Sequence, residues 1–314
     1  MIITIEPKAR PCPGVERAIA LVEDNLRRGE KIFSVGNLIH NRREVERLER
    51  LGLQMLSKEE LHSCTAKKMP SQAGFLVRCH GETNVTLDKA KSCGLYVLDA
   101  TCPIVKHSQE VVDQHVRDGW GIIIAAGRKD HPEVIGLLDR TKGNGAVVTS
   151  KEEAEKLDFE DRSLLLAQTT VNPVLFSDIR RILSKRLNGL KIVDTTCRFI
   201  KNRQKDIESF SVEQDMIVLV GGKDSANCHL LFEISRRLNV NSYWIEGIKA
   251  LDKSWFNGAQ KIGITGGAST PRWQLEEMKS FISNNHSKKN PKGLKNRKGG
   301  KFLWWMLKNL STEK

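Results

Sequence analysis

Three cysteines occupy equivalent positions in an internal repeat of the chain. Cys102 and Cys197 each end a D-x-T-C sequence, and the residues around them match at a constant offset of 95. Cys12 opens a weaker third copy, in which an amphipathic helical pattern again follows the cysteine. Because thiolates are ligands for soft metal centres, three thiols supplied by one repeat predict a common metal site.

The residues alone leave several roles open for these cysteines. A single cysteine is most often a buried packing residue, but three at equivalent positions favour a ligand set. A zinc ion would need a histidine or water as its fourth ligand. An iron-sulfur cube usually takes four cysteines, so three would leave one iron open to a substrate. The remaining cysteines lack the repeat and are interpreted as packing residues: Cys64, Cys79, Cys93 and Cys228.

Each repeat cysteine is expected where a strand gives way to a helix. Pro13 and Pro103 directly follow two of them, and proline is favoured at the first helical position. The free amides and the dipole of a helix N-terminus stabilise negative charge. We therefore expect a lowered thiol pKa and a favourable setting for an anionic cluster.

Histidine, hydroxyl and amide side chains follow several apolar strand patterns. A lone histidine is more often structural, but this group offers many hydrogen-bond donors and few carboxylates. Such a donor set, with helix N-terminal amides, is what a diphosphate requires. The candidate diphosphate ligands are His40, His80, His131, Thr169, Ser225, Asn227 and Ser269.

Glu133 is the carboxylate of this group that could deliver protons. Burial in a cavity would raise the pKa of its carboxyl group toward a useful value for proton transfer. The alternative is structural, because a glutamate just after Pro132 is favoured in any first helical turn.

The repeat predicts an α/β protein of three pseudo-equivalent lobes. Their expected bounds are 13–101, 102–196 and 197–284, with a first strand in 1–12 that completes the last lobe. Alternating strands and helices favour parallel sheets, in which ligands gather at the carboxyl ends of the strands. Three lobes facing inward would bring the cysteines and the polar loops to one central cavity.

The charge distribution argues against a nucleic-acid-binding protein with structural cysteines. The chain carries a net charge of +13, but +8 of it lies from His286 onward, which leaves +5 for residues 1–285. The body therefore lacks a dense basic stripe with interleaved aromatic residues. A zinc hydrolase that uses the same cysteines and Glu133 is the other rival.

Cysteine usage and the chain start predict a cytoplasmic protein. Seven widely spread cysteines fit a reducing compartment better than a disulfide framework. The first residues lack the pattern of a secretory signal, and no apolar run reaches a membrane-spanning length.

The segment 285–314 has the composition of a basic, disordered extension. Its stretch 302–310, with Trp304 and Trp305, is too short to cross a bilayer. It could instead rest on an anionic membrane surface or contact a partner.

With these residues in view, the chain resembles the 4-hydroxy-3-methylbut-2-enyl diphosphate reductases of the non-mevalonate isoprenoid pathway. The resemblance spans about residues 9–272. It rests on CPGVERAI at Cys12, VGNLIHN at His40, RCHG at His80, DATCPIVK at Cys102, HPEVIG at His131, QTT at Thr169, DTTCRFIKNRQ at Cys197, GGKDSAN at Ser225 and ITGGASTP at Ser269.

The resemblance implies a trefoil of three lobes around a central [4Fe-4S] cluster held by Cys12, Cys102 and Cys197, whose fourth iron binds the allylic hydroxyl of the substrate. It also implies that Glu133, helped by Thr169, supplies the proton that lets water leave. The products would be isopentenyl and dimethylallyl diphosphate, and a ferredoxin or flavodoxin would donate the electrons. The implied diphosphate contacts are His40, His80, His131, Ser225, Asn227 and Ser269.

One position departs from the pattern of this family. Ala226 stands where the family usually has a second serine, so the hydroxyl that would make one diphosphate contact is absent. Ser225 and Asn227 on either side are intact, and a backbone amide at the position can still donate. We therefore expect weaker diphosphate binding rather than loss of function.

Overall fold

The computed structural model describes residues 1–287, which form three four-stranded parallel sheets. The chain divides into two compact units, residues 1–279 and residues 280–314. The expectations for the basic extension fall almost wholly outside the described residues. Within residues 1–287, no helix is both long and apolar enough to span a membrane.

The first sheet has the strand order β3-β2-β4-β5. Its two central strands are buried along their whole length, as expected for parallel strands covered by helices on both faces. Its strands are β2 (Ile32–Val35), β3 (Gln54–Leu56), β4 (Gly74–Val77) and β5 (Tyr96–Asp99), and its helices are α1 (Pro13–Arg27), α2 (Arg42–Arg50), α3 (Lys58–Ser63) and α4 (Asn84–Ser92), with a 3-10 turn η1 (Ala66–Lys68).

The second sheet repeats this arrangement with the order β7-β6-β8-β9. Its central strands are again fully buried. Its strands are β6 (Gly121–Ala125), β7 (Gly145–Val148), β8 (Ser163–Ala167) and β9 (Lys191–Val193), and its helices are α5 (Pro103–Arg117), α6 (Pro132–Arg140), α7 (Lys151–Lys156) and α8 (Pro173–Arg186).

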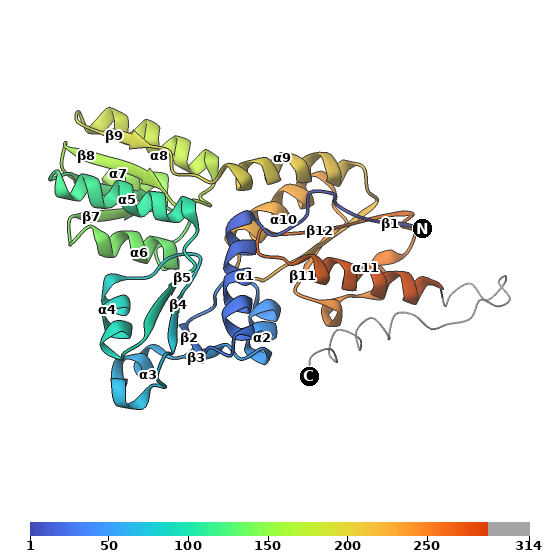
Figure 1. Cartoon of the computed structure of the whole chain (residues 1–314). Helices are drawn as coiled ribbons and strands as arrows, with labels where there is room; N and C mark the ends of the chain where they lie inside the picture. Colours follow the sequence, from blue (N-terminus) through green and yellow to red (C-terminus); the bar gives the residue numbers. More distant parts are fainter. Residues whose placement is uncertain (288–314) are drawn as a thin grey trace. The chain divides into compact units, whose positions relative to one another are not determined.

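The third sheet has the order β11-β10-β12-β1 and takes its last strand from the start of the chain. In Figure 1 the dark blue β1 runs beside the orange β12, with Ile3 opposite Ile262. Its strands are β1 (Ile2–Ile5), β10 (Met216–Val220), β11 (Ser242–Ile245) and β12 (Lys261–Gly266), and its helical segments are α9 (Arg198–Val212), α10 (Ala226–Leu238), η2 (Ile248–Ala250), η3 (Lys253–Phe256) and α11 (Arg272–Ser287).

The three sheets therefore share one topology, and β1 is the equivalent of β5 and β9. A cysteine of the repeat follows each of these equivalent edge strands. The α/β architecture of three pseudo-equivalent lobes is confirmed, whereas the exact lobe bounds 13–101, 102–196 and 197–284 stay a prediction.

Local sequence explains where the helices after the first two cysteines begin and end. Helices α1 and α5 begin with Pro13 and Pro103, whose fixed φ suits a first helical position. Gly29 and Gly119 follow their last turns with φ of 79° and 74°, a conformation that glycine adopts without steric cost. Both helices therefore have defined ends that do not depend on distant contacts.

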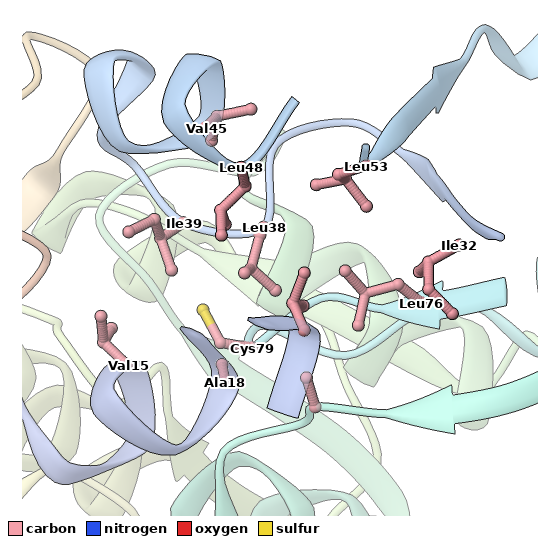
Figure 2. Packing of buried hydrophobic residues seen from close by; sticks show 12 residues of the cluster. Val15, Ala18, Ile32, Leu38, Ile39, Val45, Leu48, Leu53, Leu76 and Cys79 are labelled. Carbon is pink, nitrogen blue, oxygen red and sulfur yellow. The ribbon is translucent and has the colours of Figure 1, made fainter. Parts of the chain in front are cut away.

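Each sheet packs its helices through apolar side chains. On α1 the predicted helical face is observed, since Val15, Ala18 and Val22 are buried. Figure 2 shows Val15 and Ala18 packed with Leu38, Ile39 and other residues of this cluster. Burying such side chains stabilises the fold by roughly 1.5–3 kcal/mol for each large one. This packing holds the N-terminus of α1, and thus Cys12, in place.

Candidate functional site

All three repeat cysteines occupy the residue directly before a helix. Cys12, Cys102 and Cys197 are the N-cap residues of α1, α5 and α9. The Cys12 sulfur accepts a hydrogen bond from the Val15 amide at 3.4 Å. The prediction that the cysteines lie at strand-to-helix transitions is therefore confirmed.

Each cysteine is also tied to the end of the third strand in a sheet. The backbone N–H of Cys102 donates to the Cys79 carbonyl at 2.9 Å, and that of Cys197 donates to the Thr169 carbonyl at 2.8 Å. The N–H of Cys12 donates to the Ala268 carbonyl at 2.9 Å. These equivalent bonds hold the thiols beside the loops in which the other candidate residues lie.

One cavity brings the predicted residues together. Three cysteines, three histidines, Glu133, Thr169 and the polar residues of the third lobe all line it. Two of the sulfurs can be placed relative to Gly14, because a Cβ atom on that residue would lie 2.7 Å from the Cys102 sulfur and 3.8 Å from the Cys12 sulfur. The residues that line it are Cys12, Gly14, Val15, Ile39, His40, Cys79, His80, Cys102, Ile104, Val105, His131, Glu133, Thr169, Thr170, Cys197, Ile200, Ser225, Ala226, Asn227, Ala268 and Ser269.

The expected lowering of the thiol pKa is wrong for Cys12 and Cys197. Burial raises the pKa of Cys12 to about 11, and the neighbouring Cys102 and Cys197 raise it further, against the lowering effect of the Val15 amide. Burial also raises the pKa of Cys197. Desolvation outweighs the helix N-terminus, so that a metal centre must displace thiol protons as it binds.

Three histidine rings form a second group in the same cavity. The ring centroids of His40 and His80 are 4.4 Å apart, and His131 lies 5.2 and 5.3 Å from them. Burial, with nearby Arg128, lowers the pKa of His40 to about 4, and burial with the neighbouring His40 lowers that of His131 to about 3. Both rings are therefore neutral near pH 7, and their hydrogen-bonding roles depend on the tautomer.

The tautomers of two histidines follow from their contacts. His131 is the N-cap residue of α6, and its Nδ1 accepts a hydrogen bond from the Glu133 amide at 3.2 Å. A neutral His131 then carries its proton on Nε2, which lies 3.2 Å from Nε2 of His40. His40 accepts this bond and keeps its own proton on Nδ1, where it can donate to an anion.

Two candidate diphosphate ligands have buried polar atoms without partners. Among residues 1–287, no hydrogen-bond partner is found for Nδ1 of His80 or for either amide atom of Asn227. An unpaired buried polar group costs roughly 1–3 kcal/mol. A bound anion that accepts from His80 and from the Asn227 amide would satisfy the donors among these atoms.

Glu133 and Thr169 form a buried pair. The Thr169 amide and hydroxyl donate to the two carboxylate oxygens of Glu133, both at 2.7 Å, and the Glu133 side chain is only 1% exposed. Burial raises the pKa of Glu133 to about 7 although both hydrogen bonds favour the charged form. The carboxyl group is thus poised to gain and lose a proton near neutral pH.

The third lobe supplies hydroxyl groups from two loops. Ser225 is the N-cap residue of α10, and its hydroxyl accepts from the Cys228 amide at 3.2 Å. The Ser269 hydroxyl donates to the His40 carbonyl at 3.1 Å, which joins the third lobe to the first. Ala226, where a second serine was expected, also lines the cavity.

The structure places these residues in loops beyond the strands. β2 ends at Val35 and β6 at Ala125, whereas His40 and His131 lie several residues later, beside or at the N-caps of α2 and α6. The prediction that these side chains follow the strands is confirmed, and a loop of several residues lies between each strand and its histidine. The intervening loops let the side chains turn into the cavity.

Sequence reasoning did not find two features of this site. Cys79 is buried in the core, as expected for a packing residue, but it also lines the cavity. Arg78 pairs with Glu82, and this pair encloses His80 within one short loop. The available signal was the sequence RCHGE itself, in which both partners and the thiol flank a candidate ligand.

Comparisons with known proteins identify one family. A family model described as LytB protein matches residues 3–283. An Aquifex aeolicus protein named 4-hydroxy-3-methylbut-2-enyl diphosphate reductase is 35% identical over 284 residues, which cover 89% of this chain and 95% of the relative. A Clostridioides difficile protein of the same name is 33% identical and is covered over 100% of its length, against 90% of this chain.

Solved structures show the same relationship. A structure of (E)-4-hydroxy-3-methyl-but-2-enyl diphosphate reductase, described as the terminal enzyme of the non-mevalonate pathway, matches with a TM-score of 0.68 and 35% identity, over 90% of this chain and 100% of that one. A Plasmodium falciparum reductase structure has a TM-score of 0.79 over 99% of both chains, and at 23% identity it supports the fold. The chain belongs to the LytB family, among the relatives named 4-hydroxy-3-methylbut-2-enyl diphosphate reductase, as its sequence predicted.

Proposed function

We propose that the chain reduces 4-hydroxy-3-methylbut-2-enyl diphosphate to isopentenyl and dimethylallyl diphosphate in the central cavity, as the last step of the non-mevalonate pathway. The observation that carries this proposal is the meeting of three thiols, a histidine group and a buried carboxyl in one cavity. Each group answers one need of the reaction: electrons, an anion site and a proton. The relatives and the solved structure bear the name of this activity.

The three repeat cysteines fit an iron-sulfur cluster. They are free thiols at three helix N-termini, and the Cys12 and Cys102 sulfurs both lie within 4 Å of the position that a Cβ atom on Gly14 would take. The helix amides favour an anionic centre. We assign the cluster as [4Fe-4S], held by Cys12, Cys102 and Cys197. When bound, it supplies single electrons and one iron that lacks a protein thiolate.

The histidines and the polar loops bind the diphosphate. His40 and His80 line the cavity, and Nδ1 of His80 and the Asn227 amide are buried without a hydrogen-bond partner among residues 1–287. Ser225 and Ser269 contribute hydroxyls at the opposite loops. These neutral donors fix the anion in place and orient the allylic hydroxyl toward the cysteines. His131 completes the group through His40.

Glu133 holds the proton that the reaction consumes at the leaving group. Its carboxyl can pass a proton to the Thr169 hydroxyl, 2.7 Å away, which in turn donates to the departing oxygen. The C–O bond breaks with two electrons from outside, and the oxygen leaves as water after it takes this proton. A second proton is added to the allylic carbon skeleton, so that charge and atoms balance.

The electrons come from a small one-electron carrier, for which a ferredoxin or flavodoxin is suited. The reaction consumes two electrons, and a carrier of this kind can deliver them one at a time. A cytoplasmic location follows from the same proposal, since these carriers and reduced thiols share a reducing compartment.

A zinc enzyme is the alternative that one observation supports. His40, His80 and His131 offer nitrogen atoms that lie within 4.8 Å of one another, which is the donor set of a catalytic zinc site. Metal analysis of anaerobically purified protein separates the two functions. About four irons with matching sulfide per chain support the cluster, whereas a colourless protein with one zinc contradicts it.

Anaerobic turnover tests the activity directly. The iron-loaded protein, given 4-hydroxy-3-methylbut-2-enyl diphosphate and a strong one-electron reductant, is expected to form both five-carbon diphosphates. If iron-loaded protein forms neither product, the proposed reaction is wrong.

A further inference from the structure

Cys79 is a fourth thiol at the cavity, and the proposed reaction gives it no role. It lies outside the repeat, directly before His80, and its side chain is buried. Figure 2 shows it among Val15, Ala18 and Ile39. Its backbone carbonyl accepts from Cys102, as described above, which leaves the thiol free to act on another group.

The thiol of Cys79 contacts one nitrogen of the next side chain. Its sulfur lies 3.5 Å from Nε2 of His80, within the range of a hydrogen bond to sulfur. The other ring nitrogen, Nδ1, is buried and has no partner within residues 1–287. His80 therefore has one nitrogen engaged by the protein and one left for a ligand.

The direction of this hydrogen bond decides what His80 can bind. A neutral imidazole carries one proton, and the partner of one nitrogen determines which nitrogen holds it. If Nε2 donated to sulfur, Nδ1 would present a lone pair, which repels a phosphate oxygen. If the thiol donates to Nε2, the proton stays on Nδ1 and the ring can donate to that oxygen.

His80 is rarely doubly protonated near neutral pH. Burial lowers its pKa well below the ordinary value, and the neighbouring His40 and His131 add to this effect. A buried thiol in apolar surroundings stays protonated and is available as a donor. The neutral tautomer of His80 therefore controls its binding.

We propose that Cys79 is a positioning residue whose S–H group donates to Nε2 of His80 and so keeps the proton on Nδ1, the nitrogen that binds the diphosphate. This inference rests on the proposed function, because it takes the ligand to be an anion that accepts hydrogen bonds. It completes a pattern. The Glu133 amide fixes the tautomer of His131, His131 fixes that of His40, and Cys79 fixes that of His80.

The direct test reads the tautomer in the cluster-loaded protein. Long-range ¹⁵N–¹H spectra of protein labelled with ¹⁵N-histidine distinguish the two neutral tautomers, and His80→Asn identifies the His80 signals. The wild-type protein is expected to show the proton on Nδ1 of His80. A proton on Nε2 in the wild type would overturn the inference without any variant of Cys79.

Variants test the cause and its consequence for binding. Cys79→Ala removes the donor and is expected to shift His80 toward the Nε2–H tautomer and to weaken the binding of inorganic pyrophosphate, measured by calorimetry, about 5- to 10-fold. Cys79→Ser keeps a donor and is expected to preserve the tautomer and hold the affinity within about twofold of wild type.

Cys93→Ala is the matched control. Cys93 is also buried, but its sulfur lies 3.9 Å from the Leu61 carbonyl, and Cys93 does not line the cavity. The Cys93→Ala variant should be less stable because the substitution leaves a void in the core. The His80 tautomer and pyrophosphate binding should not change. An equal effect of Cys93→Ala would show that Cys79 acts only by packing.

The outcomes separate this inference from the proposed function. A wild-type protein that does not bind pyrophosphate contradicts the diphosphate site itself. A wild-type protein that binds it, beside a Cys79→Ala variant with unchanged tautomer and affinity, contradicts only the role of Cys79. Should Cys79→Ala fail to fold, the wild-type spectrum and Cys79→Ser still decide, because both must show the Nδ1–H form.

Discussion

The cysteines and the polar side chains share one cavity, yet the fold treats them differently. Cys12, Cys102 and Cys197 have the same surroundings three times over: an edge strand before, a helix after, and a backbone bond to the end of a third strand. The polar residues at equivalent loops differ in type, since third strands lead to His80, Thr169 and Ser269. The repeat therefore places three equivalent thiols at the cavity, and its divergence surrounds them with polar side chains of different types.

The largest loss of activity is expected when one of the three repeat cysteines is replaced. Cys102→Ser should remove iron from the protein and abolish turnover, because it deletes one of three equivalent ligands. Metal analysis and absorption spectra check the first effect, and product assay checks the second. Cys93→Ser, at a buried cysteine away from the cavity, should keep its iron. A brown, active Cys102→Ser protein would contradict the ligand assignment.

Glu133→Gln tests the polar side chains of the cavity, which differ from one lobe to the next. The amide keeps the size of the side chain but cannot supply the proton, so turnover should fall about 10²- to 10⁴-fold. Iron content should stay at the wild-type level because Glu133 is not a ligand. Parallel iron and product measurements check this split, and an active variant would refute the proton-donor role.

Gly14→Ala tests how closely the repeated set is packed. The added Cβ would lie 2.7 Å from the Cys102 sulfur, so the thiol must move and iron loading should fall several-fold. Gly136→Ala is the matched control, since its Cβ would meet the Glu82 backbone at an ordinary 3.6 Å within a helix. That variant should keep its iron and gain up to about 1 kcal/mol of helix stability. Iron quantification and thermal melting compare the two.

The pH profile tests the buried carboxyl in the wild-type protein. Burial raises the pKa of Glu133 to about 7, and the donor form is the protonated one. The protonated fraction therefore falls as pH rises through about 7, and turnover should drop about tenfold per pH unit above it. Rates at saturating substrate between pH 6 and 9 measure this. A flat profile across that range argues against Glu133 as the limiting proton source.

The smallest change in kinetics is expected at the polar side of the cavity, where the three lobes differ. Ala226→Ser restores a hydroxyl at a position that lines the cavity, beside Ser225 and Asn227. One added neutral hydrogen bond should lower KM for the diphosphate about two- to tenfold with kcat nearly unchanged. Steady-state kinetics provide the measurement, and an unchanged KM would show that the backbone already fills this role.

Much of the fold could be predicted because the internal repeat can be recognised in the amino-acid sequence. The spacing of Cys102 and Cys197, the prolines after the cysteines and the apolar strands identified three equivalent units and the place of β1. The outer strands β3, β7 and β11 were not anticipated. They are short edge strands with partly exposed residues, so their sequences lack a continuous apolar run.

Residue types and spacing by themselves identified the three equivalent thiols, and the motifs identified the family. Only the tertiary structure decided the electrostatic state of the site. A helix N-terminus can be read from local sequence, but the desolvation that raises the pKa of Cys12 depends on every segment packed around it. The contact of Cys79 with His80 was likewise undetermined, because neighbours in sequence touch only when the backbone and the surrounding core fix both side chains.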